Sequence, residues 1–458
     1  MASEPISAVA SSTRTPVLDA AGERAVTLPD YAYSPDTRAS TAATKRRFEV
    51  HTFDSLSDRS FRWYFFSMFG WFASMNMQML VRGVIVYNLT GSYAALGLIS
   101  LANAIPGLFL SLPGGLLADR APKKLVVQVG QTSNMVVCGA IAALLLSDML
   151  VFWHLVACAV LQGGINALIM PARQSMIPEI VSGERMMNAV ALNSAGMNVM
   201  RLAAPALGGV LLAALGAGWV YLTMGLLYGI GAVFLLPVRN RDLTDDEVKA
   251  MSAQNQQNNN GSLSDIIEGC KYIKRDSIVM MILITNFLIV LVSMPFQMML
   301  PGFAKDVLDA GDSQIGLLMS MTGIGSLAGS LVIASMPERH RGLVLLVSSL
   351  FLGFAMLAFA ASSFYWLTAA IVIGIGVGQA GRMSLSNVLI QSYTAKEYRG
   401  RVMSVYMLEF SLVSFGTFLV GILANVVGAQ VALGGTAVGL IALTCSYLLF
   451  VPRMRRLN

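Results

Sequence analysis

The sequence has little charge for its length. Of 458 residues, 12% are charged and 55% are hydrophobic, whereas an ordinary soluble domain carries about 25% charged residues. A soluble protein of this size needs a polar surface, which these side chains do not supply. The composition therefore predicts a protein whose solvent is the lipid bilayer.

The sequence also lacks the patterns of an enzyme. It has three histidines and four cysteines, without the spacing of a metal site or a disulfide framework. There is no phosphate-binding GxxxxGK loop and no nucleophile–base set. We therefore expect a protein that is not an enzyme and that has no cofactor and no metal. The net charge of +6 does not indicate a nucleic-acid partner, because the basic residues lie at the ends of apolar segments.

Apolar runs of roughly 20 residues, the length that crosses the hydrocarbon core of a bilayer, recur from Arg62 onward. The sequence predicts twelve such spans: 63–88, 94–117, 124–146, 149–171, 187–214, 217–237, 277–300, 313–335, 342–360, 364–386, 401–427 and 430–451. The predicted fold class is an all-α integral membrane protein with twelve transmembrane helices in two six-helix halves. Its predicted parts are a disordered cytoplasmic tail (1–60), a first half (61–238), a cytoplasmic linker (239–276), a second half (277–451) and a basic cytoplasmic tail (452–458).

The linker contains SLSDIIEGCKYIKRD, in which apolar residues recur at helical spacing. This pattern predicts a short helix. Either a helix on the membrane surface or a solvated linker helix fits the pattern.

Lysine and arginine indicate the orientation. Nearly all of the 31 basic residues fall in the tails or in loops on one side of the predicted spans. Lys305 lies in a loop on the other side, and three arginines, Arg82, Arg201 and Arg382, fall within spans. Because cytoplasmic loops collect Lys and Arg, both termini are predicted to be cytoplasmic.

The chain repeats itself. With a shift of 219 residues, 78–120 lies over 297–339 without a gap, and eleven of the 43 positions are identical. Shorter matches occur at shifts of 217 and 212, between corresponding predicted spans. The repeat predicts two similar halves in parallel arrangement, as in transporters that bind their substrate at the midplane between repeats.

One loop concentrates the charge. GGLLADRAPKKL (114–125) joins the second and third spans, and MPERHRGL (336–343) takes the equivalent place in the second half. The first string resembles the signature loop of the major facilitator superfamily, although Pro122 stands where the family pattern has glycine.

The resemblance implies a cytoplasmic gate that closes and reopens. A carboxylate at a helix end can bind basic side chains or the N-terminus of a facing helix. The alternative is that the loop charges only set the topology. The expected gate residues are Gly115, Asp119, Arg120, Lys123, Lys124, Glu338 and Arg339.

A second stretch narrows the resemblance. PARQSMIPEIVSGERMMNAVALNSAGMNVMRLAAPALGG (171–209), with YNLTGSYAALGL (87–98) and YRGRVMSVY (398–406), looks like the branch that contains the bacterial enterobactin exporter and macrolide efflux proteins. The likeness implies a bacterial cytoplasmic-membrane exporter of small amphiphilic molecules, driven by the proton gradient.

Two family patterns are degraded. The antiporter motif of the fifth span ends Gly-Pro-x-x-Gly-Gly in the family, and here it begins with Ala204. Pro205, Gly208 and Gly209 still allow a kink and a close helix contact. Ala159 replaces the arginine of the fourth-span motif, so the coupling role of that arginine does not carry over.

Ionisable residues inside a membrane are functional candidates. Glu409 is the one acidic residue in a predicted span, which makes it the candidate proton carrier. Arg382 lies at similar depth on the neighbouring span, so a permanent structural pair is the alternative. Arg82 and Arg201 are candidates for holding an anionic substrate, and Arg201 has a rival packing role beside Pro205.

Neutral polar residues recur at symmetry-related places. Gln78 corresponds to Gln297, and Gln162 corresponds to Gln379. With Asn166, they are candidates for lining a substrate cavity, and hydrogen bonds between helices are the alternative.

The leading hypothesis is a proton-coupled exporter of siderophore, macrolide or drug-like molecules that works by alternating access as a monomer. Its expected partners are the substrate, protons and the bilayer. An importer of a small solute and a membrane sensor or assembly protein remain as alternatives.

Overall fold

The computed structural model describes residues 54–181, 183–239, 263–336, 339–395 and 397–457. Within these ranges the side chains of 54, 111–120, 183–184, 263–267 and 410–411 are not described. Most of the predicted tail, most of the linker and Glu338 therefore lie outside the described residues.

Every described element is helical. The first group comprises a short 3-10 helix, η1 (Asp54–Ser57), and α1 (Arg59–Thr90), α2 (Tyr93–Arg120), α3 (Lys123–Leu146), α4 (Phe152–Ile180), α5 (Gly183–Leu215) and α6 (Ala217–Phe234). The second comprises α8 (Leu263–Arg275), α9 (Ser277–Ser293), α10 (Pro295–Asp306), α11 (Asp312–Ser335), α12 (Arg341–Ala361), α13 (Tyr365–Tyr393), α14 (Arg399–Tyr406), α15 (Glu409–Val427), α16 (Ala429–Phe450) and α17 (Pro452–Arg455).

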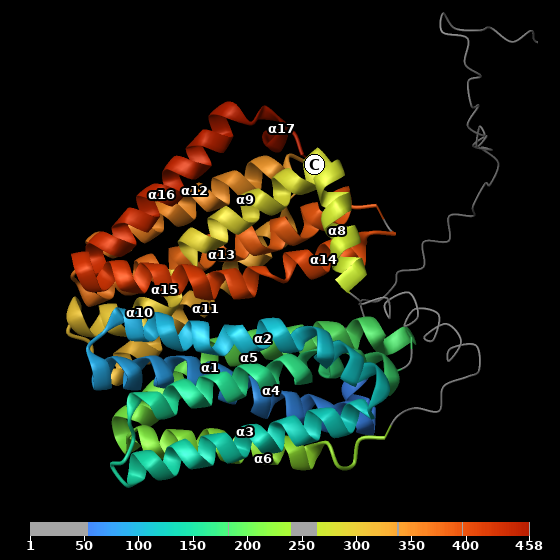
Figure 1. Ribbon diagram of the computed structural model, residues 1–458, viewed down its shortest axis with the longest axis vertical. Helices are drawn as coiled ribbons and strands as arrows, with labels where there is room; N and C mark the ends of the chain where they lie inside the picture. Colours follow the sequence, from blue (N-terminus) through green and yellow to red (C-terminus); the bar gives the residue numbers. More distant parts are fainter. Residues whose placement is uncertain (1–53, 182, 240–262, 337–338, 396, 458) are drawn as a thin grey trace, which may run out of the picture. The chain divides into compact units, whose positions relative to one another are not determined.

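The two groups form two halves that pack against each other (Figure 1). Ten helical segments of the described chain are long and apolar enough to cross a membrane, with α9 and α10 counted as one of them. The protein is therefore an all-helical, multi-pass membrane protein. α1 and the α14–α15 pair occupy the places of the first and eleventh predicted spans.

Residues 54–60, which the sequence analysis places in a disordered tail, belong to the folded part of the structure, in η1 and the start of α1. The hydroxyl of Ser55 donates to Asn188 Oδ1 on α5 at 2.7 Å. The carboxylate of Asp58 accepts from the backbone N–H groups of Ser60 and Phe61 and so caps α1. These polar contacts, together with Leu56 packed against a buried apolar cluster, hold the segment. The segment is short and mostly polar, which is why hydropathy did not reveal it.

Two predicted spans are interrupted. The seventh divides into α9 and α10 at Met294, directly before Pro295, and the eleventh divides into α14 and α15 at Met407 and Leu408. A proline cannot donate its backbone nitrogen to the preceding turn, so Pro295 accounts for the first interruption. Discontinuous spans in transporters often mark binding sites.

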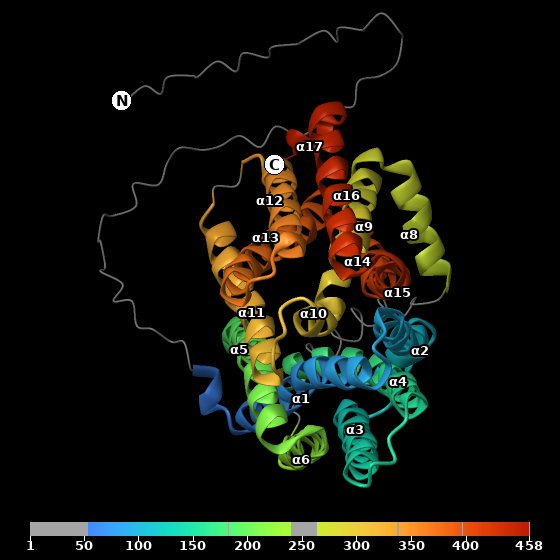
Figure 2. The same ribbon diagram turned by 90° about the vertical axis from the view of Figure 1, so that its left-hand side faces the viewer.

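Glycines bring helix backbones of the two halves into contact. A Cβ added to Gly97 on α2 would lie 2.6 Å from Phe418 Cα on α15. A Cβ added to Gly316 on α11 would lie 2.6 Å from the carbonyl oxygen of Pro205 on α5. Figure 2 shows the same two pairs, α2 beside α15 and α5 beside α11. Only a residue without a side chain fits at such distances.

The glycines in these contacts lie at positions related by the sequence repeat. Gly97 and Gly316 are 219 residues apart, the shift of the longest match. On the facing helices, Gly209 lies against the carbonyl oxygen of Asp312 and Gly421 lies against that of Tyr93. In each repeat-related pair, the glycine of the first half contacts the backbone of the second half, and the glycine of the second half contacts the backbone of the first.

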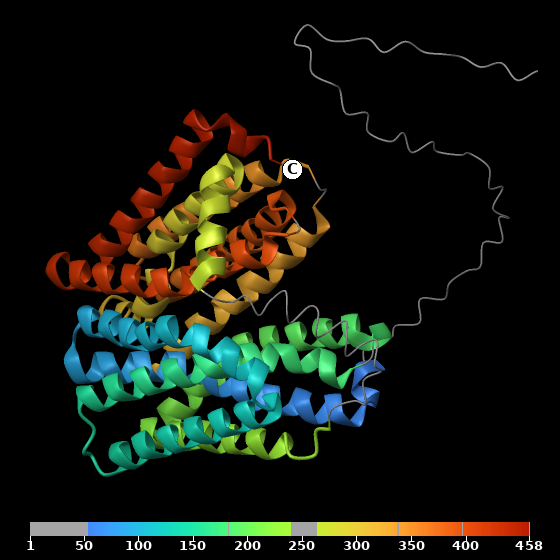
Figure 3. The ribbon, with the colours of Figure 1, turned by 45° about the vertical axis from the view of Figure 1, so that its right-hand side comes forward.

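The contacts between the halves gather toward one face of the bundle. We call the face where α2 ends and α3 begins the basic face, and the face where α1 ends and α2 begins the opposite face. Cross-half contacts extend from Tyr93 and Asn425 at the opposite face inward to Ser100 and Ser414, whose hydroxyls lie 3.1 Å apart. Toward the basic face the ribbons of the two halves diverge (Figure 3).

Replacing Gly97 with alanine should separate α2 from α15, because the added methyl group meets backbone atoms rather than a flexible side chain. We expect Gly97→Ala to lower the free energy of unfolding by about 1–3 kcal/mol, measured by thermal unfolding in detergent. Gly139→Ala is the matched control, because no atom lies within 4 Å of the added carbon. Equal stability of the two variants would contradict the close packing.

Candidate functional site

Three predicted residues meet inside the first half. Gln78 Nε2 on α1 donates to Gln162 Oε1 on α4 at 2.7 Å, and Arg82 Nη2 donates to the same oxygen. Cys158 and Cys138 flank this glutamine, with Gln162 Nε2 3.7 Å from Cys138 Sγ. We call Gln78, Arg82 and Gln162 the first-half cluster. All three side chains are buried.

A second cluster lies inside the second half. Arg382 Nη1 on α13 donates to Asn286 Oδ1 on α9 at 2.9 Å. Asn286 Nδ2 in turn donates to Glu409 Oε2 at 2.7 Å. The same carboxylate oxygen lies 3.8 Å from Arg382 Nη1, so the three buried residues form a bridged ion pair.

Glu409 occupies a special place on the backbone. It is the first residue of α15, directly after the interruption of the eleventh span. The free N–H groups at the N-terminus of a helix favour a carboxylate there. The interruption therefore brings a helix N-terminus, as well as Arg382 and Asn286, close to this acid.

The remaining cavity candidates stay outside these clusters. Asn166 accepts from Asn134 at 3.4 Å within the first half. Gln297 is half-buried on α10, and Nε2 of the buried Gln379 has no hydrogen-bond partner among the described residues. Arg201 is exposed on α5, one residue before Leu202, which lies against Gly323 of the other half.

The structure corrects the position of Arg173. The fourth predicted span ends at residue 171, which places this arginine in a cytoplasmic loop. α4 continues to Ile180 through two prolines, and Arg173 is buried with its guanidinium carbon 4.7 Å from the centre of the Trp71 ring. The three guanidinium nitrogens of Arg173 have no hydrogen-bond partner among the described residues.

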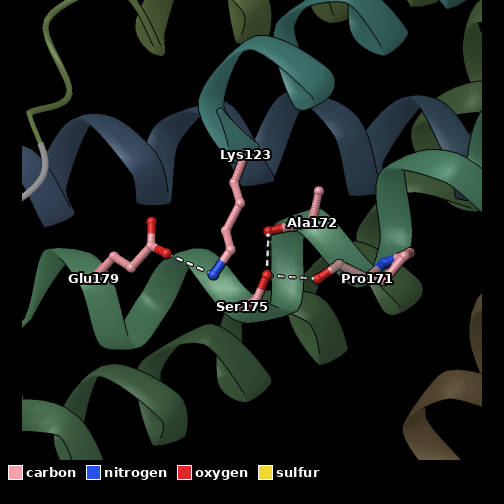
Figure 4. A network of polar contacts seen from close by, with 5 residues as sticks. All are labelled: Lys123, Pro171, Ala172, Ser175 and Glu179. Atoms are coloured by element: carbon pink, nitrogen blue, oxygen red, sulfur yellow. Dashed lines mark hydrogen bonds and ion pairs between the residues drawn. The ribbon is translucent and has the colours of Figure 1, made fainter. Parts of the chain in front are cut away.

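Part of the expected gate can be described at the basic face. Lys123 Nζ lies 2.5 Å from Glu179 Oε1, which joins the start of α3 to the end of α4 (Figure 4). In the same view the Ser175 hydroxyl donates to backbone oxygens of Pro171 and Ala172. Lys124 donates to the carbonyl oxygens of Leu236 and Val238, in the segment directly after α6. These bonds fasten helices within the first half.

The other gate residues are less completely described. Gly115, Asp119 and Arg120 belong to the last turns of α2, and their side chains are among those not described. Glu338 lies outside the described residues, and Arg339 is exposed. Their role in a gate stays a prediction.

The helix-packing residues of α5 lie at the boundary. The carbonyl oxygen of Pro205 and Gly209 contact Gly316, while Gly208 faces Met77 on α1. These residues therefore let α5 approach α11 on one side and α1 on the other.

A polar cluster joins the halves at the opposite face. Tyr87 and Tyr93, whose rings lie 5.0 Å apart, both donate to Asp306 Oδ2 at the end of α10, Tyr93 at 2.9 Å. Lys305 donates to Asn88 at 2.5 Å. We call Tyr87, Tyr93 and Asp306 the outer latch.

Sequence reasoning missed the outer latch, Asn286 and Arg173. Asn286 is a lone amide in the apolar run SIVMMILITNFLIVLVS, which was a usable signal, because a buried amide needs a partner. The tyrosines and Asp306 gave no such signal, since aromatic and acidic residues are ordinary at the ends of spans.

A family model described as transmembrane secretion effector matches residues 50–458. The chain belongs to this family of major facilitator superfamily transporters. The match covers both halves.

Curated relatives agree with this assignment. The chain is 25% identical to the staphyloferrin A transporter of Staphylococcus aureus over 73% of its own length and 81% of the relative. It is 24% identical to the MFS-type transporter YfiS of Bacillus subtilis over 76% of its length and 82% of the relative.

Solved structures share the fold. A bacterial homologue of the human lysosomal transporter Spinster, in an inward-facing and occupied conformation, matches 86% of the chain with a TM-score of 0.67 and 14% identity. The nucleoside transporter NupG matches 85% with a TM-score of 0.65 and 14% identity. Similarity at this level shows the fold alone.

Breaking the bridged ion pair should be costly. Arg382→Met leaves the buried carboxylate of Glu409 without its cation, and we expect a loss of about 3–5 kcal/mol of stability. The double variant Arg382→Met/Glu409→Met should recover much of this loss, because no unpaired charge remains. Unfolding of the three proteins in detergent measures both effects, and additive losses would contradict the pairing.

Removing the two tyrosine hydroxyl groups of the outer latch should let the two halves separate more readily at the opposite face. Each hydrogen bond is worth about 1 kcal/mol, so we expect Tyr87→Phe/Tyr93→Phe to increase opening by roughly fivefold or more. Opening is measured as maleimide labelling of Ser100→Cys, which is buried at the boundary, in a Cys270→Ser background that removes the exposed native cysteine.

Tyr365→Phe is the control for this experiment. The Tyr365 hydroxyl donates to Gln314 at 2.9 Å at the same face but within one half. Equal labelling of the Ser100→Cys/Cys270→Ser parent, the Tyr87→Phe/Tyr93→Phe variant and the Tyr365→Phe control would show that the latch does not hold the halves together.

Proposed function

We propose that the protein is a proton-coupled exporter of small amphiphilic molecules that works by alternating access. The observation that carries the proposal is the placement of the contacts between the halves. Backbone contacts and the outer latch join them toward the opposite face, while the ribbons diverge toward the basic face. In this proposal the structure represents the state that is open toward the cytoplasm, and rocking about the boundary opens the other side.

Family and relatives support the direction and the substrate class. The family is described as a secretion effector, which favours export over import. One relative is named for transport of staphyloferrin A, which favours siderophore-like cargo, and the resemblance to enterobactin and macrolide exporters favours the same size range. The named relatives come from bacteria, so we place the protein in the bacterial cytoplasmic membrane, with both termini inside.

Glu409 is the proposed proton carrier. It is a buried carboxylate inside a membrane span, and such groups commonly form proton pathways in transporters. Its bonds to Asn286 and its closeness to Arg382 equally fit a structural pair. Transport measurements distinguish the two roles.

Proton flux in everted membrane vesicles tests the function. A pH-sensitive dye reports the gradient while siderophores, macrolides and dyes are added one at a time. We expect one of these compounds to dissipate the gradient in vesicles with the wild-type protein and in those with Glu397→Gln. Glu397 is an exposed acid at the basic face, so its variant controls for the loss of one carboxylate.

Glu409→Gln should abolish the response, because the amide cannot carry a proton. If it responds like the wild type, coupling lies elsewhere and Glu409 is the structural partner of Arg382. If no compound acts on the wild-type protein, proton-coupled export of these classes is contradicted.

A further inference from the structure

Buried arginines outnumber buried acids in the first half. Between their ends, α1 to α6 contain the buried Arg82 and Arg173 and the exposed Arg201. The acids of these helices lie in their first or last turns, as Glu179 does beside Lys123. A cation removed from water is unfavourable unless a charge or several hydrogen bonds compensate for it.

Two buried arginines of the protein have a visible compensation. Arg382 is 0% exposed and pairs with Glu409 through Asn286. Arg173 is 4% exposed and lies over the Trp71 ring, whose electron-rich face attracts a cation.

Arg82 has only neutral partners. Its Nη2 donates to the amide oxygen of Gln162 and lies 4.0 Å from Cys158 Sγ. Its Nε is buried without a hydrogen-bond partner among the described residues. The side chain is 9% exposed, so it is the least enclosed of the three buried arginines.

The neighbours of Arg82 are all neutral: the Gln162 amide, the Cys158 and Cys138 thiols and the Tyr221 hydroxyl. The oxygen of Gln162 already accepts from Gln78, from Arg82 and from the Cys158 thiol. Its Nε2 has only the sulfur of Cys138 at 3.7 Å, which is a weak acceptor. The group that these donors lack is an acceptor with negative charge, and a planar carboxylate matches the guanidinium fork.

We propose that the transported molecule carries a carboxylate that binds Arg82 and Gln162 in the first half. This inference rests on the proposed transport function and names the substrate class for it. Gln78 is a positioning residue, because it acts by holding the Gln162 side chain.

The first test supplies the missing charge from the protein itself. Gln162→Glu keeps the oxygen that accepts from Gln78 and Arg82 and adds a negative charge beside the guanidinium. We expect the melting temperature of the purified full-length protein without ligand to rise. Gln131→Glu is the matched control, because Gln131 is a buried glutamine that bonds to Ser67, and it should lower the melting temperature. A Gln162→Glu protein no more stable than the wild type would overturn the proposal.

The second test adds a carboxylate from solution. Citrate should raise the melting temperature of the wild-type protein and of Lys274→Gln, an exposed charge-loss control on α8. Its uncharged triethyl ester should not. Arg82→Gln and Gln162→Glu should need at least tenfold more citrate for the same shift, and Arg82→Lys should give an intermediate value.

Citrate without effect on the wild-type protein, or inorganic phosphate with a larger effect, would overturn the carboxylate assignment. An equal citrate response in wild type and Arg82→Gln would overturn the site. These binding measurements need no proton gradient. If citrate binds as expected but the vesicle experiment fails, the proposed proton coupling is contradicted. If the vesicle experiment succeeds but citrate does not bind, only the carboxylate inference is contradicted.

Discussion

The close approach of helix backbones at the boundary is the constraint on which the arrangement of the two halves depends. Lipid gives apolar helices no hydrophobic reason to associate, so small residues and close packing must hold them together. Gly97 and Gly421 serve this purpose where α2 meets α15, and Gly209 and Gly316 do so where α5 meets α11. Because these contacts involve backbone atoms, they fix the places about which the halves can pivot.

The two buried polar clusters are arranged so that a pivot leaves them intact, whereas the Ser100–Ser414 hydrogen bond crosses the boundary. The first-half cluster joins α1 to α4, and the Arg382–Asn286–Glu409 group joins α9, α13 and α15. Breaking a buried charge pair costs far more than breaking exposed bonds. Among the described residues the charged bonds between the halves are made by Asp306, whose carboxylate is exposed, and by Lys305, which donates to Asn88. Motion between the halves breaks these solvent-accessible charge interactions and leaves the two buried clusters intact.

The sequence predicted the class and the symmetry because both depend on local pattern. Span length and composition predicted the membrane helices, and the 219-residue shift identified the two glycines that the structure places at the boundary. Contacts between halves could not be predicted, since they join residues more than a hundred positions apart. Arg173 was misplaced because the predicted span stopped at residue 171, where the apolar run ends, whereas α4 continues to Ile180 with Ser175 donating to the carbonyl oxygen of Pro171.

The two halves share a fold and differ in chemistry. The first half keeps continuous helices around a cation that lacks an anion, and the second half has interrupted spans around a paired acid. Among the described residues no hydrogen bond or ion pair joins the two clusters. If substrate binds in one half and a proton in the other, each can affect the other only by changing how the halves pack. The coupling free energy must then pass through the glycine contacts, so the rigidity of those backbone contacts would set how tightly the two events are linked.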